Sequence, residues 1–187
     1  MALTTVRSTG IGSLPAISGA NLTTLNASNI SSGTLNSARF SGGKVLQVVQ
    51  AEDSTELDLS SNTYTDVGLS ASITPSATSS KVLVFWTVHS RFMTTISGFG
   101  TRLVRGSTNV WTTTRHYYIY TEDNNNDRHS TMFNYLDSPS TTSATTYKIQ
   151  VATESSNQVL FNANDNQSII TLMEISAWLQ FQMHYIV

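Results

Sequence analysis

From residue 44 onward the sequence is a series of short runs rich in Val, Ile, Thr, Tyr, Phe and Trp, separated by Gly, Asn, Ser, Asp or Pro. Such runs predict β-strands joined by turns. In Tyr147–Val151 apolar and polar residues alternate, which predicts one packed and one solvated face. The continuously apolar Val82–Trp86 predicts a central strand. We expect strands over Lys44–Gln50, Thr63–Leu69, Lys81–His89, Phe99–Val104, Asn109–Tyr120, Ser130–Leu136, Thr146–Thr153, Gln158–Asn162 and Ser168–Ile175.

The number and spacing of these runs predict an all-β fold. Eight or nine short strands separated by turns indicate an antiparallel β-sandwich with a jelly-roll-like topology. A last run, Ala177–Val187, is too rich in large apolar side chains to be left in water. We expect a further strand or an interface segment there.

Residues 1–43 differ in composition from the rest of the chain. They contain two charged side chains, Arg7 and Arg39, and no aromatic residue before Phe40. So few large apolar residues cannot offset the chain entropy of an isolated folded unit. We therefore divide the chain into an extended N-terminal docking and stalk segment, residues 1–43, and a β-sandwich head domain, residues 44–187.

The apolar residues of the first segment are nevertheless regularly spaced. Four of them stand five positions apart, a period that fits neither a single helix nor a flat strand but fits a chain wound around other chains. A flexible linker with chance spacing is the alternative. We expect a homotrimer whose stalk contains Leu25, Ile30, Leu35 and Phe40. Nearer the N-terminus, the apolar residues expected to dock on another protein are Leu3, Val6, Ile11, Leu14 and Ile17.

Composition narrows the possible functions. Ser, Thr and Asn supply 68 of the 187 residues, charged residues make up only 12%, and the net charge is −2. A nucleic-acid-binding protein would usually carry a basic patch, so we expect no nucleic-acid partner. No apolar run approaches the roughly 18 residues of a membrane helix, so we expect no membrane insertion. The absence of cysteine excludes disulfides and thiolate zinc sites.

The residues that could carry catalysis or bind a metal form no recognisable motif. The four histidines, His89, His116, His129 and His184, show no i, i+4 pair. The acids of Glu122–Asp127 lack the glycine and the final Glu of a calcium loop. Paired carboxylates for glycoside cleavage would have to be assembled by the fold, and nothing in the sequence favours them. We expect no enzymatic activity, no cofactor and no metal.

The strongest local feature is Trp111–Tyr120, in which four large aromatic side chains lie beside Arg115 and His116. The simplest interpretation is a strand whose alternate aromatic residues fill the core. The alternative is a recognition surface, since amphipathic rings contact sugars or partner proteins at low entropy cost. We expect a hairpin from this run to Ser130–Leu136, with a polar tip. The candidate receptor contacts at that tip are Tyr120, Asp123, Asn125, Asp127 and Arg128.

Four stretches resemble fibre proteins of tailed bacteriophages of the marine and cyanobacterial type. Leu25–Phe40 (LNASNISSGTLNSARF) is similar to a motif that precedes a compact β-rich C-terminal domain in such chains. Thr63–Val84, Tyr135–Val151 and Ser168–Ile175 are similar to that domain, where family members tend to end, whereas this chain continues to Val187. The resemblance implies a homotrimer, other virion proteins of the tail, baseplate or capsid as partners, and a role in host attachment or particle structure.

These observations predict a structural component of a phage virion. We expect a short tail fibre that docks through its N-terminus and binds the host surface, for example a surface glycan, through a trimeric β head. A capsid decoration or cement trimer is the alternative, because it also needs a docking N-terminus and a β-rich head. A glycan depolymerase is disfavoured, because such enzymes usually have a long β-solenoid. The expected location is the virion, assembled in the host cytoplasm and extracellular on the released particle.

Overall fold

The computed structural model describes residues 44–94, 97–116, 118–122, 126–154 and 157–177. The remaining residues lie outside this description, and the predictions made for them stay predictions. They include two candidate receptor contacts, Asp123 and Asn125, and all docking and stalk positions. Those positions are Leu3, Val6, Ile11, Leu14, Ile17, Leu25, Ile30, Leu35 and Phe40.

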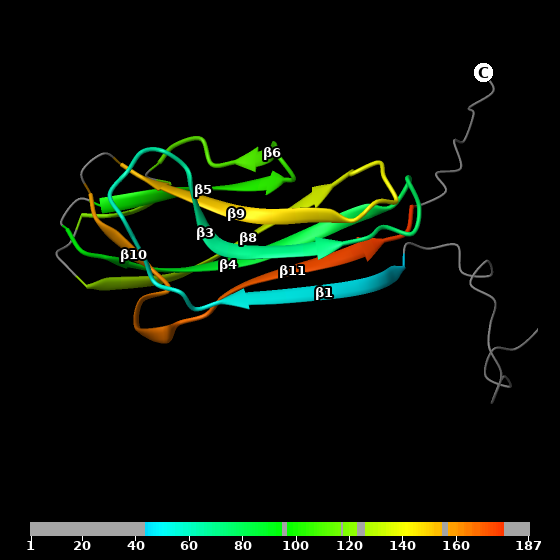
Figure 1. Cartoon of the computed structure of the whole chain (residues 1–187). Helices are drawn as coiled ribbons and strands as arrows, with labels where there is room; N and C mark the ends of the chain where they lie inside the picture. The colour runs from blue at the N-terminus through cyan, green and yellow to red at the C-terminus, as the bar shows by residue number, and fades with distance from the viewer. Residues whose placement is uncertain (1–43, 95–96, 117, 123–125, 155–156, 178–187) are drawn as a thin grey trace, which may run out of the picture. The chain divides into compact units, whose positions relative to one another are not determined.

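The described residues form two antiparallel sheets that pack face to face (Figure 1). Sheet A contains β1 (Val45–Asp53), β2 (Leu57–Leu59), β4 (Lys81–Phe92), β8 (Asp127–Asp137), β10 (Val159–Phe161) and β11 (Ser168–Ile175). Sheet B contains β3 (Thr65–Ile73), β5 (Ser97–Arg105), β6 (Thr108–Thr112), β7 (Ile119–Thr121) and β9 (Thr145–Thr153). A 3₁₀ turn, η4 (Ala163–Asp165), joins β10 to β11. No helix among the described residues is long and apolar enough to cross a membrane.

The strand order is that of a jelly roll. In sheet A the order is β1-β11-β4-β8, with β2 and β10 continuing the lines of β1 and β11. In sheet B the order is β3-β9-β5, and β6 and β7 share the outer edge of β5. The chain repeatedly crosses between the sheets, so strands adjacent in a sheet are distant in sequence, as in a jelly roll. The predicted all-β, antiparallel, jelly-roll-like fold is therefore confirmed, and Val82–Trp86 does lie in a central strand.

The core lies between the two sheets and follows the alternation of the strands. Along β4, Val82, Val84 and Trp86 point inward and are almost fully buried, while the residues between them are half-buried on the outer face. The Trp86 ring stacks on Phe133 of β8 at 5.5 Å between centroids and meets Trp111 of β6 edge-on at 5.3 Å. The core interpretation of the aromatic run is thus correct for Trp111.

Two details of the sequence prediction were wrong. The run Asn109–Tyr120 is not one strand, because β6 ends at Thr112 and β7 begins only at Ile119. The predicted hairpin does not form either, because β7 pairs with β5 in sheet B and β8 pairs with β4 in sheet A. The pairing of β8 with β4 runs from Asp137 to Asp127, whereas β7 is only three residues long, so the long pairing determines where β8 lies.

The two ends of the sandwich are distinguished by the chain segments that lie there. At one end Lys44 and Ser176, the residues flanking β1 and β11, are bonded to each other: the Lys44 amide donates to Ser176 Oγ at 2.8 Å and the Ser176 amide to the Lys44 carbonyl at 2.9 Å. We call this the terminal end, because the chain continues from it in both directions. The strands β4, β7 and β9 finish at the other end, here called the loop end (Figure 1).

Candidate functional site

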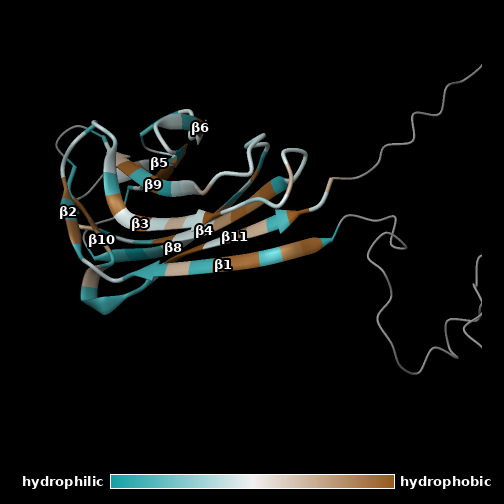
Figure 2. Cartoon of the chain, turned by 45° about the vertical axis from the view of Figure 1, so that its right-hand side comes forward, coloured by the Kyte–Doolittle hydropathy of each residue, from teal (hydrophilic) through white to brown (hydrophobic). Residues whose placement is uncertain are grey.

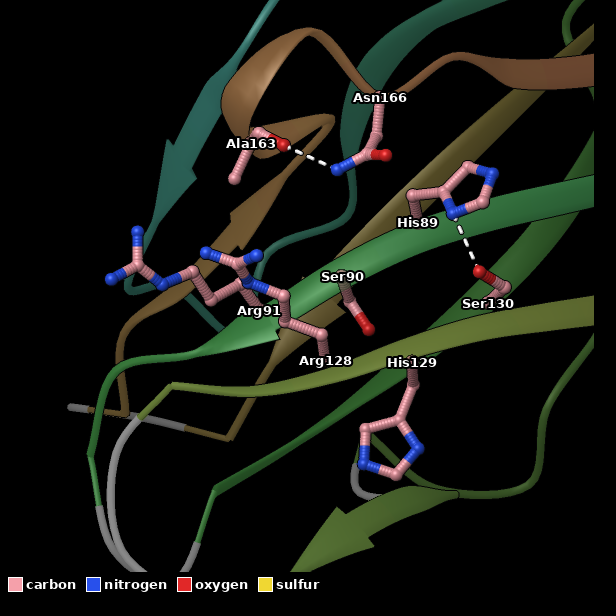
Figure 3. A pocket seen from close by; sticks show the side chains of 8 residues that line it. All are labelled: His89, Ser90, Arg91, Arg128, His129, Ser130, Ala163 and Asn166. Atoms are coloured by element: carbon pink, nitrogen blue, oxygen red, sulfur yellow. Dashed lines mark hydrogen bonds between the residues drawn. The ribbon is translucent and has the colours of Figure 1, made fainter.

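A small hollow lies at the loop end, where β4 and β8 meet the turn after β10 (Figure 3). Its volume is about 190 Å³. We call it the basic hollow, and its lining residues are His89, Ser90, Arg91, Arg128, His129, Ser130, Ala163 and Asn166. The His129 ring points to the other side of β8, toward Phe92 at 5.2 Å between centroids, so the hollow is shaped mainly by side chains of the outer face (Figure 3).

Two arginines of the basic hollow stand directly opposite each other. Arg91 of β4 and Arg128 of β8 are cross-strand partners, an arrangement that is destabilising for like charges unless an anion lies between them. The Arg91 guanidinium donates from Nε to Asn126 Oδ1 at 2.9 Å and also from Nη2 to the same oxygen. In the described part of the chain the ion pairs are Arg105–Asp137, His129–Asp127 and Lys148–Asp66, so neither arginine has a carboxylate partner there.

The structure brings some of the predicted receptor contacts to this hollow and separates others from it. Arg128 lines the hollow, and Asp127 beside it, the first residue of β8, bonds to His129 Nε2 at 2.9 Å. The hydrogen bond from His129 lowers the pKa of the Asp127 carboxyl. Tyr120 lies in β7, on sheet B, and is 40% exposed. Tyr120 and Asp127, which flank the predicted hairpin tip, therefore lie in different sheets.

A larger groove lies on sheet B, also toward the loop end, with a volume of about 520 Å³. It combines Tyr64, which sequence analysis missed, with Arg115 and His116 from the aromatic run. Tyr64 had no local signal of its own, because it precedes β3 as a single aromatic residue among polar ones. We call this the sheet B groove, and its lining residues are Asn62, Tyr64, Asn109, Thr112, Thr113, Thr114, Arg115, His116 and Glu154.

Apolar residues recur along β1, β4 and β11 (Figure 2), and by strand alternation those at every second position lie on the outer face of sheet A. The cross-strand register places Val48, Met173, Leu83 and Leu136 in one continuous row across β1, β11, β4 and β8. Three exposed members stand out, Met132 at 68%, Val48 at 55% and Leu136 at 54%. We call this surface the apolar face, and it comprises Val48, Leu83, Phe85, Met132, Leu136, Ile169 and Met173.

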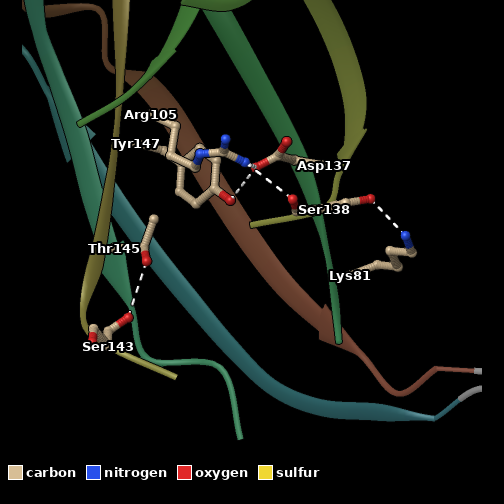
Figure 4. Close-up of polar contacts among 7 residues, drawn as sticks. All are labelled: Lys81, Arg105, Asp137, Ser138, Ser143, Thr145 and Tyr147. Atoms are coloured by element: carbon tan, nitrogen blue, oxygen red, sulfur yellow. Dashed lines mark hydrogen bonds and ion pairs between the residues drawn. The ribbon is translucent and has the colours of Figure 1, made fainter. Parts of the chain in front are cut away.

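Charged and polar groups inside the sandwich hold strands together at the terminal end. Asp137 accepts a hydrogen bond from Tyr147 Oη at 2.6 Å. It also forms an ion pair with Arg105, whose Nη1 lies 2.7 Å away (Figure 4). Burial, together with the hydrogen bond to Asp137, raises the pKa of Tyr147. The carboxylate therefore ties β5, β8 and β9 together. Within the described residues, no three His, Asp or Glu side chains gather as a metal site.

Comparison with known proteins gives only distant structural similarities. No model of a known protein family matches the sequence, and no curated protein sequence matches it either. A chain in the structure of infectious bursal disease virus, Gx strain, aligns with 12% identity and a TM-score of 0.37, covering 73% of this chain and 38% of that chain. The VP2 subviral particle of the same virus gives 13% identity and a TM-score of 0.38, covering 69% of this chain and 38% of VP2.

A third similarity is to a bacterial protein. Dimeric latent PorU from Porphyromonas gingivalis aligns with 5% identity and a TM-score of 0.34, covering 73% of this chain and 14% of PorU. The chain thus spans about 38% of the viral capsid chains to which it is similar. These TM-scores are low, and the jelly-roll assignment comes from the strand order described above.

Proposed function

We propose that this chain is a non-enzymatic structural component of a phage virion, a short tail fibre that joins the particle through residues 1–43 and meets the host with the loop end of its head. The observation that supports this most directly is the polarity of the sandwich. Lys44 and Ser176 are bonded to each other at the terminal end, so the segment that precedes the head leaves from there. The basic hollow and the sheet B groove lie toward the opposite end, where an attachment protein needs its contacts.

The apolar face supports the homotrimer that we propose as the working form of the protein. Contiguous exposed apolar surface is rare on monomeric soluble proteins and usually marks an interaction site. We assign it to contacts between copies of this chain, because β11, at the centre of that face, leads directly into Ala177–Val187, a second strongly apolar stretch of the sequence. Three copies would bury both surfaces at once.

Host contact is assigned to the loop end, with Arg128 inside the basic hollow, and Asp127 and Tyr120 outside its lining, as contact residues. Unpaired guanidinium groups recognise carboxylate or phosphate groups, which are common on bacterial surfaces. Three hollows on one trimer would raise avidity well beyond the affinity of one site if they can engage together. Replacing Arg128 with Gln should therefore reduce binding of the trimer to host cells about tenfold or more. Lys81→Gln at the terminal end is the matched control and should leave binding unchanged.

Labelling of purified particles tests the location. An antibody to the head should label the tail, and deletion of residues 1–20 should yield a folded head that no longer joins particles. Labelling spread over the capsid lattice would replace the fibre with the alternative, a capsid decoration trimer. Normal incorporation of the truncated chain would show that docking lies outside residues 1–20.

A further inference from the structure

We propose that the sheet B groove is a saccharide-binding site that takes a neutral sugar unit. This inference goes beyond the proposed virion role and does not depend on it. The groove, at about 520 Å³, falls within the range of roughly 300–1,000 Å³ typical of small-ligand sites. It combines one aromatic ring with hydroxyl, amide, carboxylate and guanidinium groups, the mixture that a ring of hydroxyl-bearing carbons requires.

Residues 113–116, which line one side of the groove, rest on small residues of sheet B. Gly100 of β5 lies opposite Ala152 of β9, so the outer face of the sheet is low at this position. The connection between β6 and β7 folds over the depression. A Cβ at Gly100 would lie 2.5 Å from the Arg115 carbonyl oxygen and 2.7 Å from Thr113 Oγ1, which no side chain could tolerate. Glycine at this position is therefore required for the loop to approach the sheet.

The Thr113 side chain fixes that loop. Thr113 is buried, and its hydroxyl shares its one hydrogen between the carbonyls of Thr101 at 3.2 Å and Arg115 at 3.1 Å while accepting from the Thr101 amide at 3.1 Å. The Thr113 amide donates to the Thr101 carbonyl at 2.9 Å. These bonds hold Arg115 and His116 in place before any ligand arrives, which reduces the entropy lost on binding.

The Tyr64 ring is held from three directions. Its hydroxyl is 3.1 Å from Thr112 Oγ1, the Arg102 guanidinium lies over the ring at 4.4 Å from the centroid, and His116 meets it edge-on at 5.2 Å. Arg102 is itself oriented by its bond from Nε to Gln150 Oε1 at 2.6 Å. An aromatic ring fixed in this way offers apolar contact area to a sugar at low conformational cost.

The charges of the groove decide which class of saccharide it suits. One cation, Arg115, and one carboxylate, Glu154, line it, and the other polar groups are neutral hydroxyls, amides and an imidazole. This balance favours a neutral sugar over an acidic one, in contrast to the basic hollow with its two arginines. Hydrolysis of a glycosidic bond normally needs two carboxyl groups, and Glu154 is the single carboxyl among the described lining residues. We therefore assign binding, not cleavage.

Ligand-observed saturation-transfer NMR on the full-length protein tests the site. The probes are free hexoses, N-acetylhexosamines and their short oligomers, with hexuronic acids as the acidic comparison. Signal is expected from one or more neutral sugars, and Tyr64→Ala should weaken binding about tenfold or more. Tyr118→Ala is the matched control, because Tyr118 is 58% exposed and lies outside the lining, and it should leave binding unchanged.

A second variant separates loss of the site from loss of the fold. Gly100→Ala should displace the Thr113–His116 connection and abolish saccharide binding while the two-sheet core, followed by near-ultraviolet circular dichroism of Trp86 and its neighbours, persists. Three results would overturn the inference: no signal from any neutral sugar, signal from hexuronic acids alone, or binding that Tyr64→Ala leaves unchanged. None of them bears on particle labelling, so the two proposals fail independently.

Discussion

The outer face of sheet B carries a connected set of polar side chains, whereas the outer face of sheet A carries a row of apolar ones. On sheet B, Asp66 accepts from Lys148 Nζ at 2.9 Å and from the Gln150 amide, and Gln150 in turn accepts from Arg102. Each of these four side chains thus has a partner on its own surface. On sheet A, the corresponding cross-strand positions are filled by Val48, Met173, Leu83 and Leu136.

This difference separates a surface whose polar groups bond to one another from a surface that exposes apolar side chains to water. The core of a sandwich needs only the inner faces of its sheets, so the outer faces are free to serve solubility or association. The sheet B network satisfies its own charges and gains little from a partner. The apolar face leaves methyl, thioether and phenyl groups in water, and burying an exposed Leu or Met side chain contributes about 1.5–3 kcal/mol.

The largest effect should come from a charge placed on the apolar face. Leu136→Glu should dissociate the proposed trimer, because a carboxylate in an apolar interface costs several kcal/mol of desolvation and removes the leucine contact as well. Ser70→Glu, at an exposed position on the outer face of sheet B, is the matched control. Sedimentation over a concentration series should show a shift of at least about tenfold in the dissociation midpoint for the first variant alone. Equal behaviour of both variants would exclude the apolar face as the subunit interface.

The carboxylates of Glu174 and Asp66 test the same comparison, because the first is buried and the second is exposed. Glu174 of β11 has no exposed surface and, among the described residues, no cationic partner, yet both of its oxygens accept hydrogen bonds. Its Oε1 accepts from the Ser76 amide at 2.7 Å, Ser76 Oγ at 2.6 Å and Ser80 Oγ at 2.7 Å, and Oε2 accepts from Gln47 Nε2 at 2.6 Å. These bonds tie the connection between β3 and β4 to both β1 and β11.

Glu174→Gln should therefore lower the free energy of unfolding by about 1–3 kcal/mol, because one oxygen is replaced by an amide that cannot accept the same bonds. The measurement is denaturant unfolding at a fixed protein concentration, since association would shift the midpoint. Glu52→Gln, on an exposed position of β1, is the control and should change stability by less than about 0.5 kcal/mol. A Glu174 variant as stable as that control would mean that the hydrogen bonds around it contribute nothing.

The same carboxylate predicts a pH dependence. Burial opposes its charge, but the hydrogen bonds from Ser76, Gln47 and Ser80 outweigh burial and lower the pKa of Glu174 from 4.5 to about 2. Because the folded-state pKa is the lower one, the stabilisation is complete above pH 4.5 and is lost as the pH falls toward 2. Up to about 3 kcal/mol is involved. The stability difference between the natural chain and Glu174→Gln should accordingly shrink between these pH values, and a difference constant with pH would contradict the assignment.

The sequence predicted the sandwich because strands carry their own signal. The alternation in Tyr147–Val151 predicted a strand that is buried on one face, and the apolar run Val82–Trp86 predicted a central strand. Both predictions were confirmed. The short β2 (Leu57–Leu59) was missed, because three residues show no periodicity. The break after Thr112 was missed for another reason: it results from hydrogen bonds between Thr113 and Thr101, a contact that no local pattern encodes.

The candidate sites were less predictable than the fold for the same reason. The polar loop predicts Arg128 as a contact residue. The basic hollow, however, also needs Arg91, a residue 37 positions earlier that β-pairing places opposite Arg128. Tyr64 joins His116 across a similar separation. Both assemblies depend on register, and register in a jelly roll is set by strands that are distant in sequence.

The smallest effect should come from the exposed carboxylate of the sheet B network. Desolvation of Asp66 is the largest single influence and opposes its charge, but the hydrogen bonds from Lys148 and Gln150 and the charges of Lys148 and Arg102 together outweigh it and lower the pKa of the carboxyl. The Asp66 side chain is 52% exposed, so water screens these interactions and the pair contributes little to stability.

Asp66→Asn should therefore cost less than about 1 kcal/mol of unfolding free energy, and the cost should diminish further in 1 M salt, where the screening length falls to about 3 Å. Denaturant unfolding at low and high salt measures both quantities, with Lys148→Gln as the matched variant from the other side of the pair. The two single variants and the double variant form a cycle whose coupling energy should be small and dependent on salt. A coupling of several kcal/mol that salt does not change would mean that this network is shielded from water, and that the outer face of sheet B, like the apolar face, is covered by a partner.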